Sequence, residues 1–159
     1  MKRTNLLALL FFTASWIPAT QAATGLPVVQ DFTIEAKESI KKQAPILVLF
    51  TSHTCTYCEI VLQDFLLPMQ RDRGYDKKVI LRQIETGSQD KLIDFNGATT
   101  SQSAFASKHQ AWGVPTVMLF DNKGQVLSSI VGLLTVDYYL AYLDIAIEES
   151  QAKIKAAAK

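Results

Sequence analysis

The hydrophobic pattern along the chain predicts four strands and four helices. Short runs of branched and apolar residues, bounded by polar or turn-forming residues, predict strands at 46–50, 78–84, 117–120 and 125–131. Apolar residues at helical spacing predict amphipathic helices at 31–43, 59–67, 101–109 and 136–147. This order places a βαβ unit before a ββα unit, which predicts an α/β domain.

Two features interrupt this pattern. Residues 85–99 are polar and lack periodicity, so we expect a long loop in which Leu92, Ile93 and Phe95 form a small apolar anchor. Pro68 follows the helix at 59–67 and is expected to end or kink it, because proline lacks a backbone N–H.

The N-terminus has the order of a secretory signal peptide. Lys2 and Arg3 precede an apolar run at 6–17 and a stretch of mostly small residues at 18–23. About twelve apolar residues are too few to cross a bilayer, which needs about twenty, and this disfavours the alternative of an uncleaved membrane anchor. We therefore expect cleavage near Ala22 and a periplasmic mature protein.

Length and composition are typical of one soluble domain. The chain has 159 residues, of which 48% are hydrophobic and 19% are charged. We divide it into a signal peptide at 1–22, a domain at 23–150 and a frayed Ala- and Lys-rich tail at 151–159. Without Lys2 and Arg3 the mature chain keeps 14 basic and 15 acidic residues, a net charge of −1. No basic patch indicates nucleic acid or an anionic membrane as a partner, and we expect a monomer.

The only two cysteines, Cys55 and Cys58, are separated by two residues at the start of a predicted helix. Unpaired N–H groups and the helix dipole favour a thiolate there, so we expect a lowered pKa for the Cys55 thiol. Cys55 is the predicted nucleophile, and Cys58, one helical turn further, is the predicted resolving cysteine. A domain with enough apolar residues for a core does not need a disulfide between these close cysteines for its stability. The pattern therefore indicates thiol-disulfide exchange.

Two other interpretations of the pair remain open. A purely structural disulfide would close so short a loop that its entropic stabilisation is small. A zinc or copper site would use Cys55, Cys58 and perhaps His53, but no second Cys-x-x-Cys or paired-histidine spacing follows. His53 either stabilises the thiolate as a cation or is merely exposed. His109 is expected to be solvated on a helix surface.

Several motifs together resemble the thioredoxin fold. The matching segments are the strand Ile46–Phe50 before Cys55-Thr56-Tyr57-Cys58, then Gly113-Val114-Pro115-Thr116, the turn Asn122-Lys123-Gly124, and Val131-Gly132-Leu133-Leu134. The resemblance covers most of the mature sequence. It implies an α/β thioredoxin fold, with a central mixed sheet of about four strands flanked by helices.

The resemblance also implies a set of site residues. In thioredoxin-fold proteins the proline matching Pro115 is cis and lies against the cysteine pair, and the backbone of the residue matching Val114 pairs with the substrate chain. We expect Cys55 and Cys58 to be catalytic, and Val114, Pro115 and Tyr57 to bind substrate. The alternative for Tyr57 is a half-buried aromatic residue at the helix start. No metal and no cofactor beyond the redox-active disulfide are implied.

The expected partners are protein or small thiol and disulfide substrates in the cell envelope, together with a membrane or periplasmic electron donor. Export and the segment Asp94-Phe95-Asn96-Gly97 resemble SoxW-type periplasmic thioredoxins, which are linked to sulfur-compound oxidation. Relatives of the Dsb and cytochrome c maturation thioredoxins are the alternative within the family.

Five positions depart from ordinary thioredoxin. Leu49 stands where thioredoxin has a buried acid, and Thr54 stands where it has tryptophan before the first cysteine. Thr56-Tyr57 replaces Gly-Pro, and Glu59 replaces lysine. These departures favour a specialised reductase over a general one. A metal-binding module and a redox-inert binding domain that kept the fold are the two competing classes of function.

Overall fold

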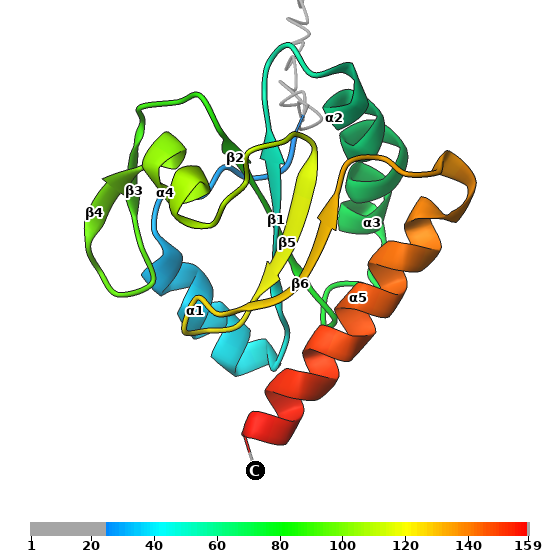
Figure 1. The fold of residues 1–159 in the computed structure, drawn as a ribbon. Coiled ribbons are helices and arrows are strands. Elements are labelled where there is room, and N and C mark those ends of the chain that lie inside the picture. The colour runs from blue at the N-terminus through cyan, green and yellow to red at the C-terminus, as the bar shows by residue number, and fades with distance from the viewer. Residues whose placement is uncertain (1–24, 159) are drawn as a thin grey trace, which may run out of the picture.

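The computed structural model describes residues 25–158, so the predicted signal peptide at 1–22 and its cleavage site lie outside the described residues. Figure 1 shows a central sheet with helices on both sides. The helices are α1 (Phe32–Lys42), α2 (Thr56–Ile60), the π-helical segment η1 (Val61–Leu66), α3 (Leu67–Arg71), α4 (Gln102–Lys108) and α5 (Val136–Ala157). The strands are β1 (Ile46–Thr51), β2 (Ile80–Glu85), β3 (Lys91–Ile93), β4 (Thr99–Ser101), β5 (Thr116–Phe120) and β6 (Val126–Val131).

The central sheet has the strand order β2-β1-β5-β6, which confirms the predicted mixed sheet of four strands. β1 is parallel to β2 and antiparallel to β5, and β5 is antiparallel to β6. Thr116 pairs with Phe50 on one side and with Val131 on the other. The ends of β1, β2 and β6 therefore meet the start of β5 at one edge of the sheet.

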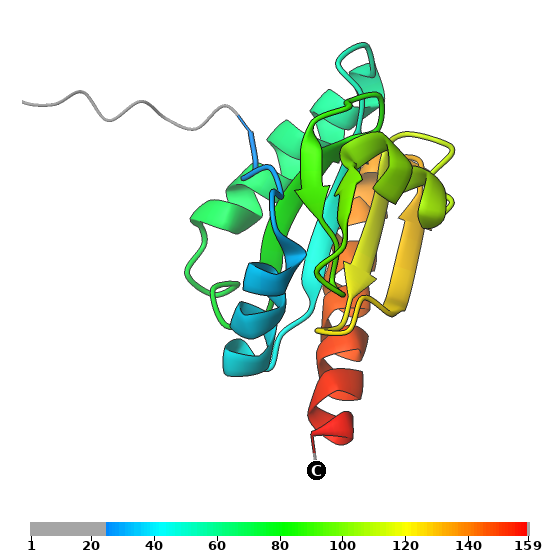
Figure 2. The same cartoon turned by 90° about the vertical axis from the view of Figure 1, so that its left-hand side faces the viewer.

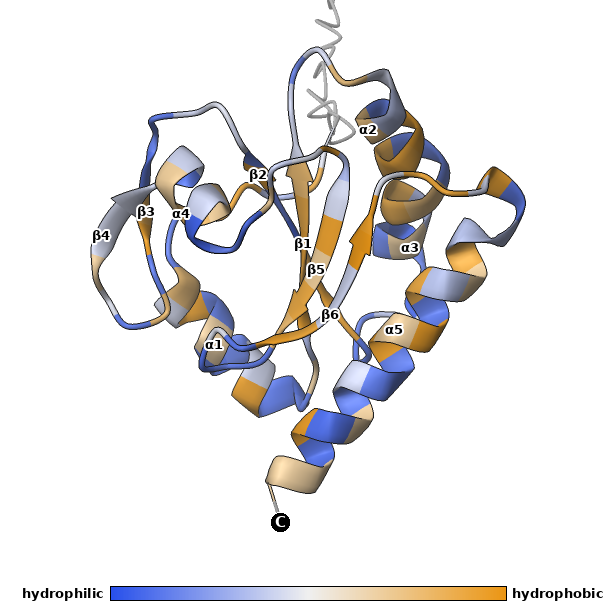
Figure 3. Cartoon of the chain, viewed as in Figure 1, coloured by the Kyte–Doolittle hydropathy of each residue, from blue (hydrophilic) through white to orange (hydrophobic). Residues whose placement is uncertain are grey.

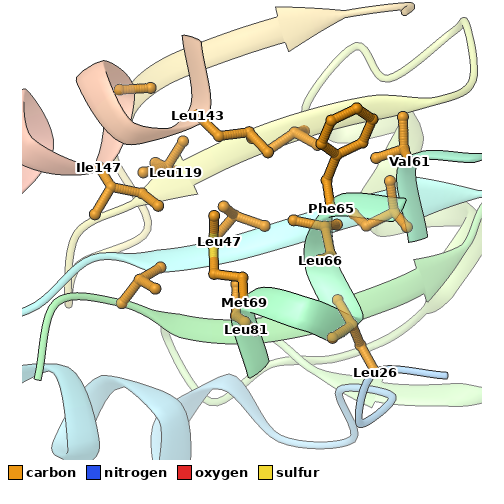
Figure 4. Close-up of a cluster of buried hydrophobic side chains, with 14 of the residues drawn as sticks. Leu26, Leu47, Val61, Phe65, Leu66, Met69, Leu81, Leu119, Leu143 and Ile147 are labelled. Atoms are coloured by element: carbon orange, nitrogen blue, oxygen red, sulfur yellow. The ribbon is translucent and has the colours of Figure 1, made fainter. Parts of the chain in front are cut away.

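The side chains of β1 alternate between two hydrophobic clusters, as the pleat of a strand requires. Leu47 and Leu49 point into a cluster with α2, η1, α3 and α5, part of which Figure 4 shows. Ile46, Val48 and Phe50 point into a second cluster with α1 and α4. All five side chains are fully buried. Figure 3 shows the matching pattern, with hydrophobic strands between helices that carry polar residues on their outer surfaces.

The second cluster is built around five phenylalanines, and we call it the aromatic cluster. Its members are Phe32, Phe50, Phe95, Phe105 and Phe120. The ring centroid of Phe32 lies 4.3 Å from that of Phe95 and 4.6 Å from that of Phe105. Such stacked pairs add about 0.5–1.5 kcal/mol each beyond the area they bury.

His109 packs against the aromatic cluster, and the prediction that it is solvated was wrong. Its ring centroid lies 4.4 Å from that of Phe105 and 4.9 Å from that of Phe120. Its Nε2 atom is buried without a hydrogen-bond partner among the described residues. Burial lowers the pKa of His109 below its usual 6.5, and the neighbouring Lys108 lowers it further, against a smaller opposing effect of Asp94.

The helix that follows the cysteines does not end at Pro68. α2, η1 and α3 are continuous from Thr56 to Arg71. The backbone N–H of Leu67 donates to the carbonyl of Leu62, five residues earlier, so the helix is wider just before the proline. Pro68 follows at the start of α3, directly after this wider turn.

Residues 85–99 do not form the expected loop throughout. β3 and β4 pair antiparallel as a separate two-stranded sheet, with Lys91 opposite Ser101. The predicted apolar anchor is present, because Leu92 is fully buried and Phe95 packs into the aromatic cluster. A Cβ atom on Gly124 would lie 2.6 Å from the Phe95 ring, so the turn between β5 and β6 approaches Phe95 closely and requires glycine.

The C-terminal residues from 151 were expected to fray, but α5 continues to Ala157. Two side chains in this last part bond to distant segments. Gln151 Nε2 donates to the Lys77 carbonyl at 3.0 Å, and Lys153 Nζ donates to the Leu127 carbonyl at 3.0 Å. Figure 2 shows this end of α5 extending beyond the sheet. No helix among residues 25–158 is long and apolar enough to cross a membrane.

Candidate active site

Cys55 and Cys58 form a disulfide at the edge where β1 ends. The two sulfurs are 2.08 Å apart and the Cα atoms 5.2 Å apart. Cys55 is partly exposed, whereas Cys58 is only 2% exposed. Cys55 is therefore the more accessible of the two cysteines, as a nucleophile must be.

The start of α2 holds Cys55 in place. Cys55 is the residue that caps this helix, with an extended backbone at φ −97° and ψ 100°. Its Sγ accepts a hydrogen bond from the Cys58 backbone N–H at 3.0 Å, and its carbonyl accepts from the Glu59 N–H at 3.2 Å. A backbone donor aimed at Sγ favours a thiolate there over a thiol.

The Val114–Pro115 peptide bond is cis, as the sequence resemblance implied. Pro115 is buried, and its carbonyl accepts from the Gly132 N–H at 2.8 Å. Because Thr116 pairs with Phe50 near the end of β1, Pro115 lies at the same edge of the sheet as the segment leading to Cys55. Val114, next to this edge, is partly exposed.

Four exposed apolar side chains belong to segments that meet at this edge, and we call them the apolar rim. They are Tyr57 (62% exposed), Trp112 (75%), Val131 (60%) and Leu134 (73%). Tyr57 is therefore not the half-buried residue that was its alternative interpretation. These side chains offer apolar contact area at the edge that holds the disulfide.

A cavity of about 620 Å³ opens on the β2 side of the disulfide. Cys55 and Cys58 form part of its wall, and Gln102 also contributes to the lining. Glu59, Glu85 and Asp90 bring three carboxylates to it, so we call it the acidic cavity.

His53 is 91% exposed at the mouth of the acidic cavity, with its Nε2 3.8 Å from Glu85 Oε2. The structure does not bring His109 to the cysteines, because His109 packs in the aromatic cluster. Among residues 25–158 there is no group of three or more His, Cys, Asp and Glu side chains placed to hold a metal ion. The alternative of a zinc or copper site therefore gains no support from these residues.

A family model described as a thioredoxin-like domain matches residues 32–147, which is most of the chain. The chain belongs to the thioredoxin-like domain family. Its disulfide between two cysteines at Cys-x-x-Cys spacing is the redox centre of a thiol-disulfide oxidoreductase. The electrons reside on the two sulfurs themselves, so this thioredoxin-like domain needs no further cofactor for the exchange.

Solved structures of low sequence identity share this fold. A thioredoxin-fold protein from Helicobacter pylori is 21% identical, with a TM-score of 0.53 over 72% of this chain and 81% of that one. Oxidized mitochondrial thioredoxin 3 from Saccharomyces cerevisiae is 16% identical, with a TM-score of 0.52 over 78% and 94%. Oxidized thioredoxin O2 from Arabidopsis thaliana is 18% identical, with a TM-score of 0.50 over 79% and 94%. A search among curated proteins gave no significant match.

Sequence reasoning missed four residues of this thioredoxin-like site. Trp112 comes two residues before Val114, and this position directly before the Gly113–Thr116 motif could have indicated that it lies at the site. Glu85 ends β2, and the ends of parallel neighbours β1 and β2 meet at one edge, which could have placed it near the cysteines. Asp90 and Gln102 reach the cavity only through the fold of residues 86–102, and no local pattern indicates that.

Proposed function

We propose that this protein is an exported, specialised reductase that exchanges dithiol for disulfide with protein or small-molecule partners in the cell envelope. The charged start, short apolar run and small residues at 1–23 support export. The resemblance to SoxW-type thioredoxins supports partners that serve sulfur-compound oxidation. A membrane or periplasmic dithiol donor would return the protein to its reduced form.

The observation that carries the chemistry is the unequal placement of the two cysteines. In the reduced protein, the Cys55 thiolate attacks one sulfur of a substrate disulfide, and the other substrate sulfur leaves as a thiolate that takes up a proton. Cys58 then loses its proton and attacks Cys55 Sγ, which releases the second substrate thiol. The substrate gains two electrons, and the protein ends as the Cys55–Cys58 disulfide that the structure contains.

The apolar rim and the Val114 backbone are the proposed contacts for a protein substrate. An extended substrate chain can pair with the backbone of Val114 while its side chains cover Trp112 and Leu134. Pro115 contributes by having no N–H of its own to leave unpaired beside the sulfurs. Tyr57 adds contact area next to Cys55.

Single cysteine variants expressed in the cell envelope test the assigned roles. Cys58→Ser keeps the attacking thiol but cannot resolve the intermediate, so partners should accumulate as mixed disulfides on non-reducing gels. Cys55→Ser should trap nothing, because Cys58 is 2% exposed. Both variants should lose turnover. Equal behaviour of the two variants without trapped partners, and stoichiometric metal bound to the reduced wild type, would overturn the oxidoreductase proposal in favour of a metal-binding module.

Two further measurements test export and direction. N-terminal sequencing of the envelope protein should find a chain that begins near Ala23, and a start at Met1 would contradict cleavage. Equilibration with glutathione buffers should give a potential closer to about −270 mV than to about −120 mV, the values of a general reductant and of a strong oxidant. A value near the latter would contradict the reducing direction.

A further inference from the structure

The acidic cavity places negative charge directly beside the reactive sulfurs. Three of its lining residues carry carboxylates, and its lining among the described residues includes no lysine or arginine. His53 is the only lining residue that could carry positive charge. A molecule that reacts with Cys55 from this side therefore meets more carboxylates than cationic groups in the cavity lining.

The backbone at two of these residues, Glu85 and Asp90, is held by the fold. The Glu85 side chain is 18% exposed, and its backbone N–H donates to Gln102 Oε1 at 2.7 Å. The Gln102 backbone N–H donates to the Asp90 carbonyl at 3.1 Å, which fixes the Asp90 loop to the start of α4. Two residues of the cavity wall are thus anchored to a third. The Glu59 and Asp90 side chains are exposed, whereas that of Glu85 is mostly buried.

Gln102 adds an unused donor to the cavity. The residue is 3% exposed, and its Oε1 is occupied by the Glu85 N–H. Its Nε2 donates to no other residue within 25–158, although the side chain lines the cavity. Because this amide is not sealed from the cavity, water can accept from it in the free protein, and a bound group could replace that water. A carbonyl or hydroxyl group of a bound substrate could do so.

We propose that the acidic cavity selects disulfide substrates that carry a positively charged group next to the reactive sulfurs, such as small amine disulfides or cysteines in basic peptide segments. This inference rests on the proposed oxidoreductase function and names its substrate class. The three carboxylates lower the energy of a cation near Cys55 and raise that of an anion by Coulomb interaction. The cavity volume of about 620 Å³ suits a small molecule or a few side chains.

Each selected substrate is reduced by the same two-electron exchange. The Cys55 thiolate displaces one substrate sulfur, and Cys58 displaces the second from Cys55. Both substrate sulfurs leave as thiols, and the cavity residues form and break no bonds. Their effect is on the local concentration and orientation of the charged substrate, and thus on the rate of the first attack.

Single-turnover kinetics with three small disulfides test the inference. The pre-reduced full-length protein, freed of reductant, is mixed with cystamine (cationic), bis(2-hydroxyethyl) disulfide (neutral) or 3,3′-dithiodipropionate (anionic). Rates are divided by the neutral rate, so that a general change in the nucleophilicity of Cys55 cancels. At low ionic strength the ratio of cationic to anionic rates should be about tenfold or more, after correction for the same ratio with free dithiothreitol.

The variants remove charge without changing shape. In the triple variant Glu59→Gln, Glu85→Gln, Asp90→Asn the ratio should fall to within about twofold of one. Glu149→Gln removes an exposed carboxylate from α5, away from the cavity, and should keep the wild-type ratio. If the triple variant does not fold, Asp90→Asn alone should lower the ratio part of the way. Raising the salt to about 1 M should lower it in the unaltered protein.

The outcomes separate the two proposals. A reduced protein that reacts with none of the three disulfides contradicts the oxidoreductase function itself. Equal reaction with all three, or a ratio that Glu149→Gln lowers as much as the triple variant does, overturns the charge selection alone. A matched pair of disulfide-linked peptides with lysine or glutamate beside the cysteine shows whether the selection extends to peptides. A lysine preference there, lost in the triple variant, supports the inference for both sources.

Discussion

On the β2 side of the Cys55–Cys58 disulfide lies a cavity with three carboxylates, and on the β5 and β6 side lie the apolar rim and the Val114 backbone. The first side rests on α4, the β3–β4 hairpin and the aromatic cluster. The second rests on β5, β6 and α5. The same sulfurs thus face two surfaces that differ in polarity, in charge and in the elements that support them.

This difference separates two kinds of recognition. Charge acts over several ångströms and depends on salt, so the acidic cavity suits the discrimination of small or charged groups. Apolar area and backbone pairing require close contact, so the apolar rim suits an extended protein chain. Changes on one side should therefore alter one class of substrate more than the other.

The largest expected effect comes from removing the support of the acidic side. Phe105 is fully buried and contacts Phe32 and His109. Phe105→Ala should lower the free energy of unfolding by about 3–5 kcal/mol, measured by chemical denaturation, because it removes a large ring and leaves a cavity. Hydrogen exchange should quicken in α4 more than in α5.

Leu143→Ala is the matched control on the other side. Leu143 is fully buried in the hydrophobic cluster that includes α5. Its replacement by alanine should lower the free energy of unfolding by about 2–5 kcal/mol. Under conditions where both variants are folded, Phe105→Ala should weaken the discrimination between cationic and anionic disulfides, and Leu143→Ala should keep it. The reverse result would show that the acidic side does not depend on the aromatic cluster.

An intermediate effect is expected at the apolar rim. Trp112→Ala should lower kcat/KM for the reduction of disulfide-bonded insulin by about tenfold, since an exposed tryptophan in a contact surface contributes about 1–2 kcal/mol or more. The rate with bis(2-hydroxyethyl) disulfide should change little, because so small a molecule need not cover the rim. Ile40→Ala removes a 61% exposed apolar side chain from α1, away from the rim, and serves as the control. A loss of equal size with both substrates would contradict a docking role for Trp112.

The smallest effect concerns His109. Its pKa is lowered in the folded protein by burial, so the unfolded chain binds a proton at higher pH than the folded one. The resulting stability is present above about pH 6.5 and is lost as the pH falls below it. His109→Leu should remove less than about 1 kcal/mol of this pH dependence, measured by denaturation at pH 5 and pH 7. Equal slopes in the wild-type protein and in His109→Leu would contradict the assignment.

Sequence patterns were sufficient for the part of the fold that has strong local signals. β1 is buried on both faces, so its residues read as one apolar run, and its end leads directly to the cysteines. The motif at Val114 and Pro115 placed the start of β5 and its cis bond. These elements define the sulfurs and their immediate neighbour.

The acidic side could not be predicted in the same way. β3 and β4 have three residues each, and β4 consists only of polar residues, so neither has a clear strand pattern. Glu85 and Gln102 are hydrogen-bonded although they are 17 positions apart in the sequence, and Glu59 comes from a different helix. His109 was misjudged because the polar residues around it resemble a surface, although Phe105, one turn earlier, is fully buried.

The N–H that donates to Cys55 Sγ belongs to the peptide backbone of Cys58. No side-chain replacement on either side of the disulfide can delete that donor. During evolution, residues of the apolar rim and the acidic cavity can therefore be substituted one at a time, and the binding of partners can change. The hydrogen bond to Cys55 Sγ is kept throughout. Only proline at position 58 would abolish the donor, and that single change would also abolish the resolving thiol.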